Sequence, residues 1–223
     1  MTAKHSGRES AGPREKPAIP GDPARAGIHE QADLEGLHPA GWAAPFHFDP
    51  GPDSPRVVRA LVEVPKGSRN KYELDKRSGL VRLDRHLYSA SHYPGDYGFV
   101  PGTLAGDGDP LDVLVMLNDP TFSSCLIEAR VVGLFRMTDG GKEDLKVLGV
   151  PHSDPLFSEI QELEDVPRHF LREVEHFFST YKTLEGVSVS VDGWDAAEVA
   201  RTAIVRAVEE FRKRVADEGR PEG

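Results

Sequence analysis

The chain has 223 residues, of which 38% are hydrophobic and 29% charged, and its formal net charge is −10. This composition is typical of a globular domain and argues against electrostatic attraction to nucleic acid or anionic lipid. No apolar stretch reaches the ~18 residues of a membrane-spanning helix, and the single cysteine, Cys125, excludes an internal disulfide and a multi-cysteine metal site.

Residues 1–55 are expected to form a disordered or loosely docked N-terminal extension. They contain half of the chain's 18 prolines and lack apolar periodicity. Trp42, Phe46 and Phe48 are the exception, since these aromatic side chains could dock on the folded domain. The first twenty residues lack the apolar region of a secretory signal, so we expect a cytoplasmic protein that binds neither nucleic acid nor membrane.

Short β-strands are predicted from Arg56 onward. The first two are separated by Pro65, and the second alternates, which places Lys71 and Glu73 on one face. Gly79 separates this second segment from its expected hairpin partner. The predicted strands are residues 56–64, 71–76, 80–89, 112–117, 129–139 and 144–150.

Two amphipathic helices are predicted after the strands. Asp165 can cap the first, over 166–185, and a capping box formed by Asp195 and Glu198 opens the second, which stops near Gly219. Strands followed by helices favour an α+β fold, a small barrel or sheet packed by helices. The apolar stripes are Phe170, Val174, Phe177, Phe178, Tyr181 and Leu184 in the first helix, and Ala197, Ala200, Ile204, Val208, Phe211 and Val215 in the second.

An acidic turn, DGDPLD, directly precedes the strand predicted at 112–117. It holds Asp107, Asp109 and Asp112 within six residues, and hard divalent cations prefer such carboxylate oxygens. The spacing does not fit an EF-hand, because the sixth position is Asp112 rather than glycine and the twelfth is Asn118 rather than glutamate. Turns favour Asp and Gly in any case, so a plain polar turn remains the alternative.

Other charged and tyrosine side chains lie at strand ends and in connecting loops, where active sites are common. A lone acid there is usually solvated, a Lys–acid pair is usually a weak surface pair, and a tyrosine is either a core residue or a hydroxyl donor. The sequence contains no P-loop, GxGxxG, GxSxG or HExxH pattern. The side chains in question are Glu63, Glu73, Asp139, Asp144, Lys71, Arg85, Lys146, Lys182, Tyr93, Tyr97 and Tyr181.

A series of segments gives the chain a family resemblance. In order they are VEVPKGSRNKYELDK, LDR, YPGDYGFVPGTLAGDGDPLDVLV, GLFRMTD, EDLKVLGVPHS, HFFSTYKTLEG and GWDAAEVA. From about Arg56 to Arg214 the chain resembles the soluble family I inorganic pyrophosphatases, and DGDPLDV matches their short signature. The resemblance implies a five-stranded OB-like β-barrel packed by helices, two of them near the C-terminus. The implied catalytic domain is 56–216, and 217–223 form a tail.

The resemblance also implies Mg²⁺-dependent hydrolysis of pyrophosphate to two orthophosphates, without a covalent intermediate. Asp109 would be the general base, and Tyr97 a hydroxyl near the nucleophile. Gly140 departs from the family, whose bacterial members often carry an acid there. The implied metal ligands are Asp107, Asp112, Asp144, Asp139, Glu63 and Glu73, and the implied substrate-binding residues are Lys71, Arg85, Lys146, Tyr181, Lys182 and Tyr93.

Charge counting is consistent with this implied site. Seven carboxylates face four cationic side chains, so a polyanion would be repelled unless metal ions bind before it or with it. The resemblance implies several Mg²⁺ ions per site, with Mn²⁺ or Zn²⁺ as substitutes. It also implies a homo-oligomer, such as the hexamer common in bacterial relatives.

Two alternative functions stay open. One is another metal-dependent phosphohydrolase acting on nucleotides or phosphate esters, and the other is a non-enzymatic OB-like module whose acids bind structural Ca²⁺.

Overall fold

The computed structural model describes residues 41–218, so most of the predicted N-terminal extension and residues 219–223 lie outside the described residues. The two helices are α1 (Arg168–Thr180) and α2 (Ala197–Glu218). The strands are β1 (Val57–Val64), β2 (Asn70–Leu74), β3 (Val81–His86), β4 (Asp96–Phe99), β5 (Asp112–Val115), β6 (Leu126–Asp139), β7 (Lys142–Pro151) and β8 (Val189–Ala196).

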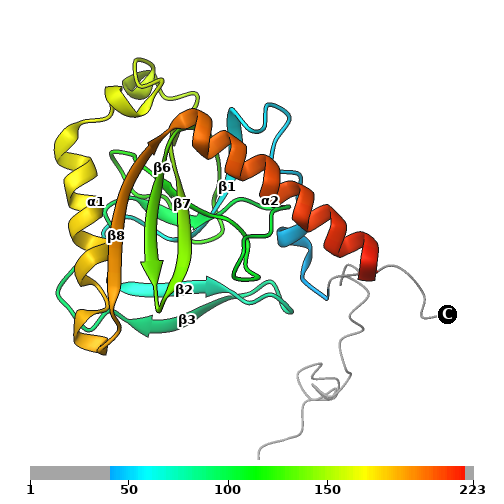
Figure 1. Cartoon of the computed structure of the whole chain (residues 1–223), viewed down its shortest axis with the longest axis horizontal. Coiled ribbons are helices and arrows are strands. Elements are labelled where there is room, and N and C mark those ends of the chain that lie inside the picture. The colour runs from blue at the N-terminus through cyan, green and yellow to red at the C-terminus, as the bar shows by residue number, and fades with distance from the viewer. Residues whose placement is uncertain (1–40, 219–223) are drawn as a thin grey trace, which may run out of the picture. The chain divides into compact units, whose positions relative to one another are not determined.

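Five strands close into a ring. They pair in the order β1-β4-β5-β7-β6, and a further pairing between β1 and β6 joins the two ends. Pairing is antiparallel except between β5 and β7, which run parallel. β8 adds to the outer side of β6, and β2 and β3 form a separate hairpin (Figure 1). The prediction of an α+β fold with a five-stranded OB-like barrel is therefore confirmed.

The two helices pack on this framework through separate apolar clusters. In Figure 1, α1 runs beside β8, and α2 extends away from the end of β8 across the strands of the ring. The aromatic face of α1, with Phe177 and Phe178, joins a cluster that includes Phe135 of β6. Ile204 and Val208 of α2 join a second cluster with side chains of the ring strands. Both predicted stripes thus lie against the core, with the exception described next.

Three details of the predicted helices are wrong. Asp165 does not cap α1, because its carboxylate instead accepts the backbone N–H groups of Gln161 and Glu162 in a preceding 3₁₀ turn, and Pro167 occupies the cap position. The first helix ends at Thr180 rather than at residue 185, so the helical period no longer applies and Leu184 is exposed. Asp195 lies within β8, one residue before the cap position of α2, and pairs with Arg136.

The segment that precedes β1 contacts the folded domain through two of its three aromatic side chains. Trp42 and Phe46 are buried, whereas Phe48 is half exposed. Phe46 stacks on Phe99 of β4 with the ring centroids 4.8 Å apart. The Trp42 ring lies 6.2 Å from that of Phe211 on α2. This segment therefore packs against the end of β4 and against the second half of α2.

Close contact between β1 and β4 in the ring requires a glycine at position 98. A Cβ atom there would overlap the carbonyl oxygen of Leu61 on β1. We expect Gly98→Ala to lower the free energy of unfolding in urea by about 3 kcal/mol, because the strands must separate to accept the methyl group. Gly106→Ala is the matched control, since no atom lies within 4 Å of its Cβ position. Equal stability of the two variants would show that the strand contact is not tight.

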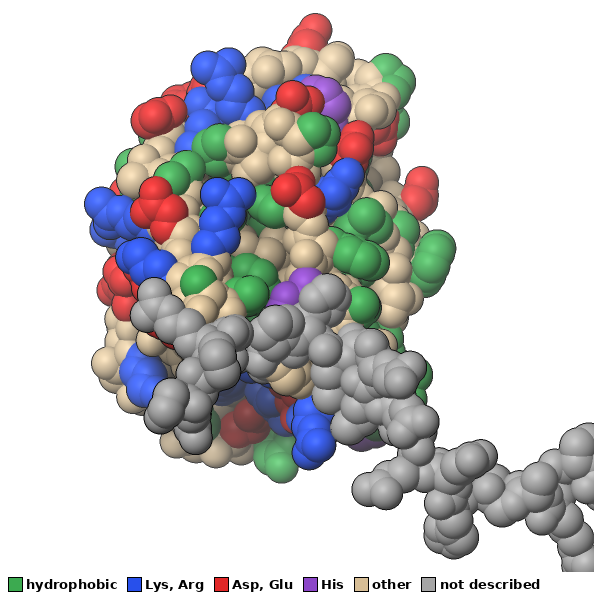
Figure 2. All heavy atoms as spheres, turned by 90° about the vertical axis from the view of Figure 1, so that its right-hand side faces the viewer, with side chains coloured by type: hydrophobic (Ala, Val, Ile, Leu, Met, Phe, Trp, Pro, Cys, Tyr) green, Lys and Arg blue, Asp and Glu red, His purple; other side chains and the backbone are tan. Residues whose placement is uncertain are grey.

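Charged side chains of both signs are scattered over the face shown in Figure 2. On the face in Figure 2, the described Lys and Arg side chains are interspersed with Asp and Glu rather than gathered into one basic patch. Electrostatic binding of a nucleic acid needs such a patch. Within residues 41–218, neither helix is long and apolar enough to cross a bilayer.

Candidate active site

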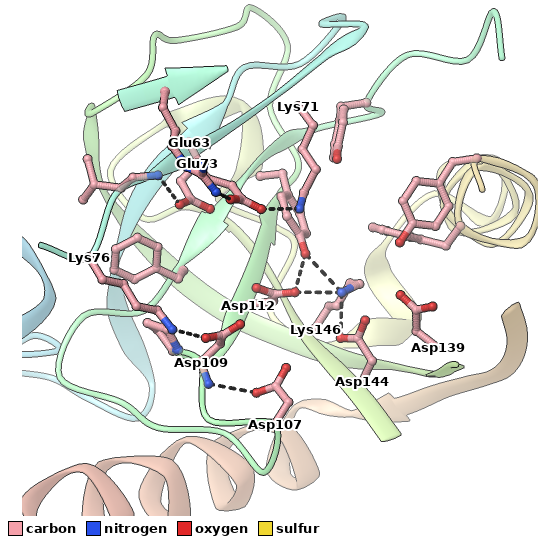
Figure 3. Close-up of a pocket in the computed structure, with 18 of the residues that line it drawn as sticks. Glu63, Lys71, Glu73, Lys76, Asp107, Asp109, Asp112, Asp139, Asp144 and Lys146 are labelled. Carbon is pink, nitrogen blue, oxygen red and sulfur yellow. Dashed lines mark hydrogen bonds and ion pairs between the residues drawn. The ribbon is translucent and has the colours of Figure 1, made fainter. Parts of the chain in front are cut away.

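A cavity of about 500 Å³ opens beside the ring and brings distant segments together. Every predicted site residue except Arg85 lines it. The residues come from β1, β2, β4, the loop before β5, the start of β5, the end of β6, β7 and the end of α1. Figure 3 shows their carboxylate and ammonium groups pointing toward one another across this space. The sequence separation of these elements explains why no local pattern alone defines the site.

Lys146 occupies the centre of the polar network. The parallel register of β5 and β7 places it opposite Asp112, and Asp144 lies two residues earlier on the same face of β7. Its Nζ lies 2.7 Å from Asp112 Oδ2, 2.7 Å from Asp144 Oδ1 and 3.1 Å from the Tyr97 hydroxyl. Burial alone would lower the pKa of Lys146, but the two carboxylates outweigh it and raise that pKa above its usual value. Lys146 is therefore a fixed positive charge.

Tyr97 reaches the same carboxylate from the other side of β5. On β4, Phe99 pairs with Asp112, and Tyr97 lies two residues earlier on the same face. Its hydroxyl donates to Asp112 Oδ2. Burial, reinforced by the charge of Asp112, raises the pKa of Tyr97 well above its usual value. Tyr97 thus stays protonated and can act as a hydrogen-bond donor near neutral pH.

Tyr93 and Tyr181 complete an aromatic wall beside Tyr97. The ring centroids of Tyr93 and Tyr97 are 5.4 Å apart, and Phe177 of α1 packs between Tyr93 and Tyr181 at 4.8 and 5.3 Å. Both tyrosines are buried, and burial raises the pKa of each. The sequence left these tyrosines open as core residues or site residues, and their rings pack in the core while they also line the cavity.

Glu63 is aimed into the cavity by an irregularity in β1. The register of β1 on β4 shifts between Val62 and Val64, and such a bulge turns the intervening side chain. The Glu63 carboxylate accepts the backbone N–H of Leu74 at 2.7 Å. Burial raises the pKa of Glu63 to about 8, so this carboxyl group is mostly protonated at neutral pH before any cation binds.

The β2–β3 hairpin carries a chain of ion pairs along one rim. Lys71 Nζ lies 2.6 Å from Glu73 and 3.4 Å from Asp84, and Glu73 also pairs with Arg82 at 2.8 Å. Burial favours the neutral form of Glu73, but the hydrogen bond and charge of Lys71 prevail and hold its pKa below the usual value. The prediction that Lys71 and Glu73 share one strand face is therefore confirmed, although the hairpin register is irregular between Lys71 and Tyr72.

Arg85 takes a different position from the one expected of a cavity residue. It lies opposite Lys71 in the hairpin register, but it is absent from the cavity lining. Its guanidinium pairs with Asp84 at 2.6 Å and with Glu185 at 3.2 Å, in the turn that follows Tyr181 and Lys182. Its predicted role in substrate binding remains a prediction.

Two lysines pair with the remaining acids. Lys182, after the end of α1, pairs with Asp139 at the end of β6. Lys76, after β2, pairs with Asp109 in the loop before β5. The backbone N–H of Asp109 donates to Asp107 Oδ1 at 3.0 Å, which links the two acids of the turn. Sequence reasoning assigned no role to Lys76, because nothing in the local pattern relates it to an acid 33 residues later.

The donor chemistry of the cavity fits hard divalent cations. Eight carboxyl groups and five cationic side chains line it, and carboxylate oxygen is the donor that Mg²⁺ and related ions prefer. Within residues 41–218, however, no three such donors already converge closely enough to hold an ion, since lysines pair with several of them. Binding a cation therefore requires rotation of side chains such as Asp107, which is exposed at the open side of the cavity.

Comparisons with known proteins agree with one another. Residues 60–212 match the family model for inorganic pyrophosphatase. An inorganic pyrophosphatase of Halalkalibacterium halodurans is 50% identical over 150 residues, covering 67% of this chain and 92% of that protein. One from Geobacillus stearothermophilus is 46% identical over 158 residues, covering 71% of this chain and 96% of that protein. The crystal structure of inorganic pyrophosphatase from Thermus thermophilus matches with a TM-score of 0.74 at 43% identity, covering 76% of this chain and 99% of that chain.

Proposed function

The chain belongs to the inorganic pyrophosphatase family and hydrolyses pyrophosphate, and from this premise we propose that the cavity around Lys146 performs the reaction with Mg²⁺. The observation that carries the proposal is the gathering of the acidic turn, the acids of β1, β2, β6 and β7, and the lysines in one cavity. The family depends on metal ions, and Mg²⁺ is proposed because the donors are carboxylate oxygens. Mn²⁺ or Zn²⁺ are proposed as substitutes.

We assign the metal-binding role to six of the acids that line the cavity. Asp107, Asp112 and Asp144 would hold the tightest ion, and Asp112 would be shared with a second one. Bound cations would supply positive charge for the phosphate oxygens and would lower the pKa of a coordinated water. Asp139, Glu63 and Glu73 would hold ions that arrive with the substrate, directly or through water.

Side chains of this chain would accept the proton of the attacking water and neutralise the negative charge of the phosphates. Asp109 would accept a proton from the attacking water while the water oxygen bonds to one phosphorus and the bridging P–O bond breaks. The Tyr97 hydroxyl would lie near the attacking oxygen while it donates its hydrogen bond to Asp112. The cations and phenols of the cavity would neutralise or hydrogen-bond the two phosphates, one of which leaves with the bridging oxygen. The residues proposed for this are Lys71, Arg85, Lys146, Tyr181, Lys182 and Tyr93.

Several proposals concern the protein as a whole. We propose a cytoplasmic homo-oligomer, such as the hexamer common in bacterial relatives, that binds pyrophosphate and neither nucleic acid nor membrane. The proposed catalytic domain is 56–216, with 1–55 as an extension and 217–223 as a tail. The net charge of −10, and the interspersed charges on the face in Figure 2, support the proposal that nucleic acid is not bound.

A substrate panel crossed with metals tests the proposed function. Full-length protein stripped with chelator is expected to release phosphate from pyrophosphate only after Mg²⁺ is restored, and much faster than from ATP or a phosphomonoester. The lysines that line the cavity suit phosphate groups of any of these substrates, so the comparison of rates decides between them. Faster release from ATP would support the alternative phosphohydrolase, and unchanged activity after chelation would contradict the metal-dependent mechanism.

A further inference from the structure

Lys76 is held over the acidic turn by a segment that precedes the region matched to the family. Its Nζ pairs with Asp109 Oδ1 and lies 4.7 Å from the centroid of the Trp42 ring. The backbone N–H of Ala43 donates to the Lys76 carbonyl at 2.5 Å. Residues 42 and 43 therefore fix Lys76 at both its main chain and its ammonium group, although the family match begins at residue 60.

The Lys76–Asp109 pair needs this support. The side chains of Lys76 and Asp109 are 36% and 60% exposed, and an ion pair so open to water contributes little and holds neither group in place. An indole face is the best aromatic partner for an ammonium group. Trp42 is itself buried, and it packs against Phe46 with centroids 5.4 Å apart and against Phe211 of α2. The buried aromatic cluster of Trp42, Phe46 and Phe211 thus supports the partly exposed side chain of Lys76.

The side chain of Asp109 depends on Lys76 for its direction. Its main chain is fixed, because its N–H donates to Asp107 and its carbonyl accepts from the N–H of Ala105 at 2.7 Å. Its carboxylate is directed by Lys76, as Figure 3 shows. A general base must be placed within hydrogen-bond reach of the proton it removes, so a freely rotating carboxylate would spend less time in the productive position.

We propose that Trp42 is a positioning residue that acts through Lys76 to orient the Asp109 carboxylate for catalysis. The contacts run from Phe211 through Trp42 and Lys76 to Asp109. The segment before β1 thereby becomes part of the active-site scaffold. This inference rests on the role proposed above for Asp109 as the general base.

A double-mutant cycle on kcat tests the inference at saturating Mg²⁺. Trp42→Leu is expected to lower kcat about three- to tenfold, the size of a cation–π contact, with KM for pyrophosphate changed less than about twofold. Trp42→Phe keeps an aromatic face and should retain more of the activity than Trp42→Leu. Lys76→Met should lower kcat at least as much as Trp42→Leu, and the double variant should be no worse than Lys76→Met. Effects that multiply in the double variant would overturn the inference.

Two controls separate positioning from loss of packing or charge. Ile204→Ala removes a buried side chain of α2 that belongs to another cluster and does not line the cavity, and it should leave kcat within about twofold even where thermal stability falls as it does in Trp42→Leu. Arg77→Met removes the neighbouring exposed charge and should leave kcat unchanged. If Trp42→Leu does not fold, the comparison of kcat between Lys76→Met and Arg77→Met tests the inference by itself. Equal kcat values for these two variants would refute it.

Asp109→Asn distinguishes this failure from failure of the proposed function. If Asp109→Asn retains wild-type turnover, the assignment of the base is wrong and Trp42 has nothing to position. If Asp109→Asn is inactive while Lys76→Met and Trp42→Leu keep full kcat, the base assignment stands and the positioning role alone is refuted.

Discussion

Asp109→Asn is expected to lower kcat about a thousandfold, the typical contribution of a positioned general base. The amide occupies the same space and can still pair through its oxygen with Lys76, but it cannot accept a proton from water at neutral pH. Metal affinity should change little, because Asp109 is assigned to the proton and not to a cation. Phosphate release at saturating Mg²⁺, together with calorimetric titration of the metal, measures both quantities.

Asp107→Asn provides the matched comparison within the same turn. It should raise the Mg²⁺ concentration needed for half-maximal activity more than it lowers kcat at saturating metal, since Asp107 is assigned to the tightest ion. If turnover were instead lost in Asp107→Asn and kept in Asp109→Asn, Asp107 would be the general base and Asp109 the metal ligand.

Lys146→Met is expected to lower the free energy of unfolding by about 2–4 kcal/mol in chelator, because removing one partner of a buried ion pair leaves the others uncompensated. The ammonium group is almost fully buried and lies 2.7 Å from both Asp112 and Asp144. Without it, these carboxylates repel each other in a partly desolvated site. Urea unfolding with chelator and with Mg²⁺ measures the effect, and Mg²⁺ should reduce the loss, since a bound cation replaces the missing positive charge.

Lys142→Met is the control for this second prediction. Lys142 lies on the same strand but is exposed, so its loss should change stability by less than about 0.5 kcal/mol. Equal stability of the Lys146 and Lys142 variants in chelator would show that the network around Lys146 does not stabilise the fold. A loss in Lys146→Met that Mg²⁺ leaves unchanged would argue against cation binding at Asp112 and Asp144.

Strands with a strong apolar or alternating pattern were predictable from the sequence, and the weaker ones were not. β1, β5, β6 and β7 appear within a few residues of their predicted positions. β4 was missed because it has only four residues, and one of them is Gly98, which the close contact with β1 requires. β8 was missed because polar residues and Gly193 interrupt its alternation, and it is stabilised by pairing with β6. Tertiary pairing decides such segments.

Which residues line the cavity could be predicted largely from the family resemblance. Which of them form ion pairs with one another could be seen only in the structure. Sequence alone placed Lys71 beside Glu73 on one strand face, because two-residue spacing sets that geometry. It could not show that Lys146 lies between Asp112 and Asp144, since this depends on the parallel register of β5 and β7. Nor could it relate Lys76 to Asp109 and Trp42, because these contacts join three separate segments.

A crystal structure of this chain with Mn²⁺ would test the central claim most directly, because the anomalous signal locates each bound ion independently of any assumed mechanism. We expect at least one strong anomalous peak within coordination distance of the Asp107, Asp112 and Asp144 carboxylates. Lys146 should then have moved away from at least one of these carboxylates or should share it with the ion. Peaks that lie only outside this cavity, in protein that still hydrolyses pyrophosphate with Mn²⁺, would contradict the central claim.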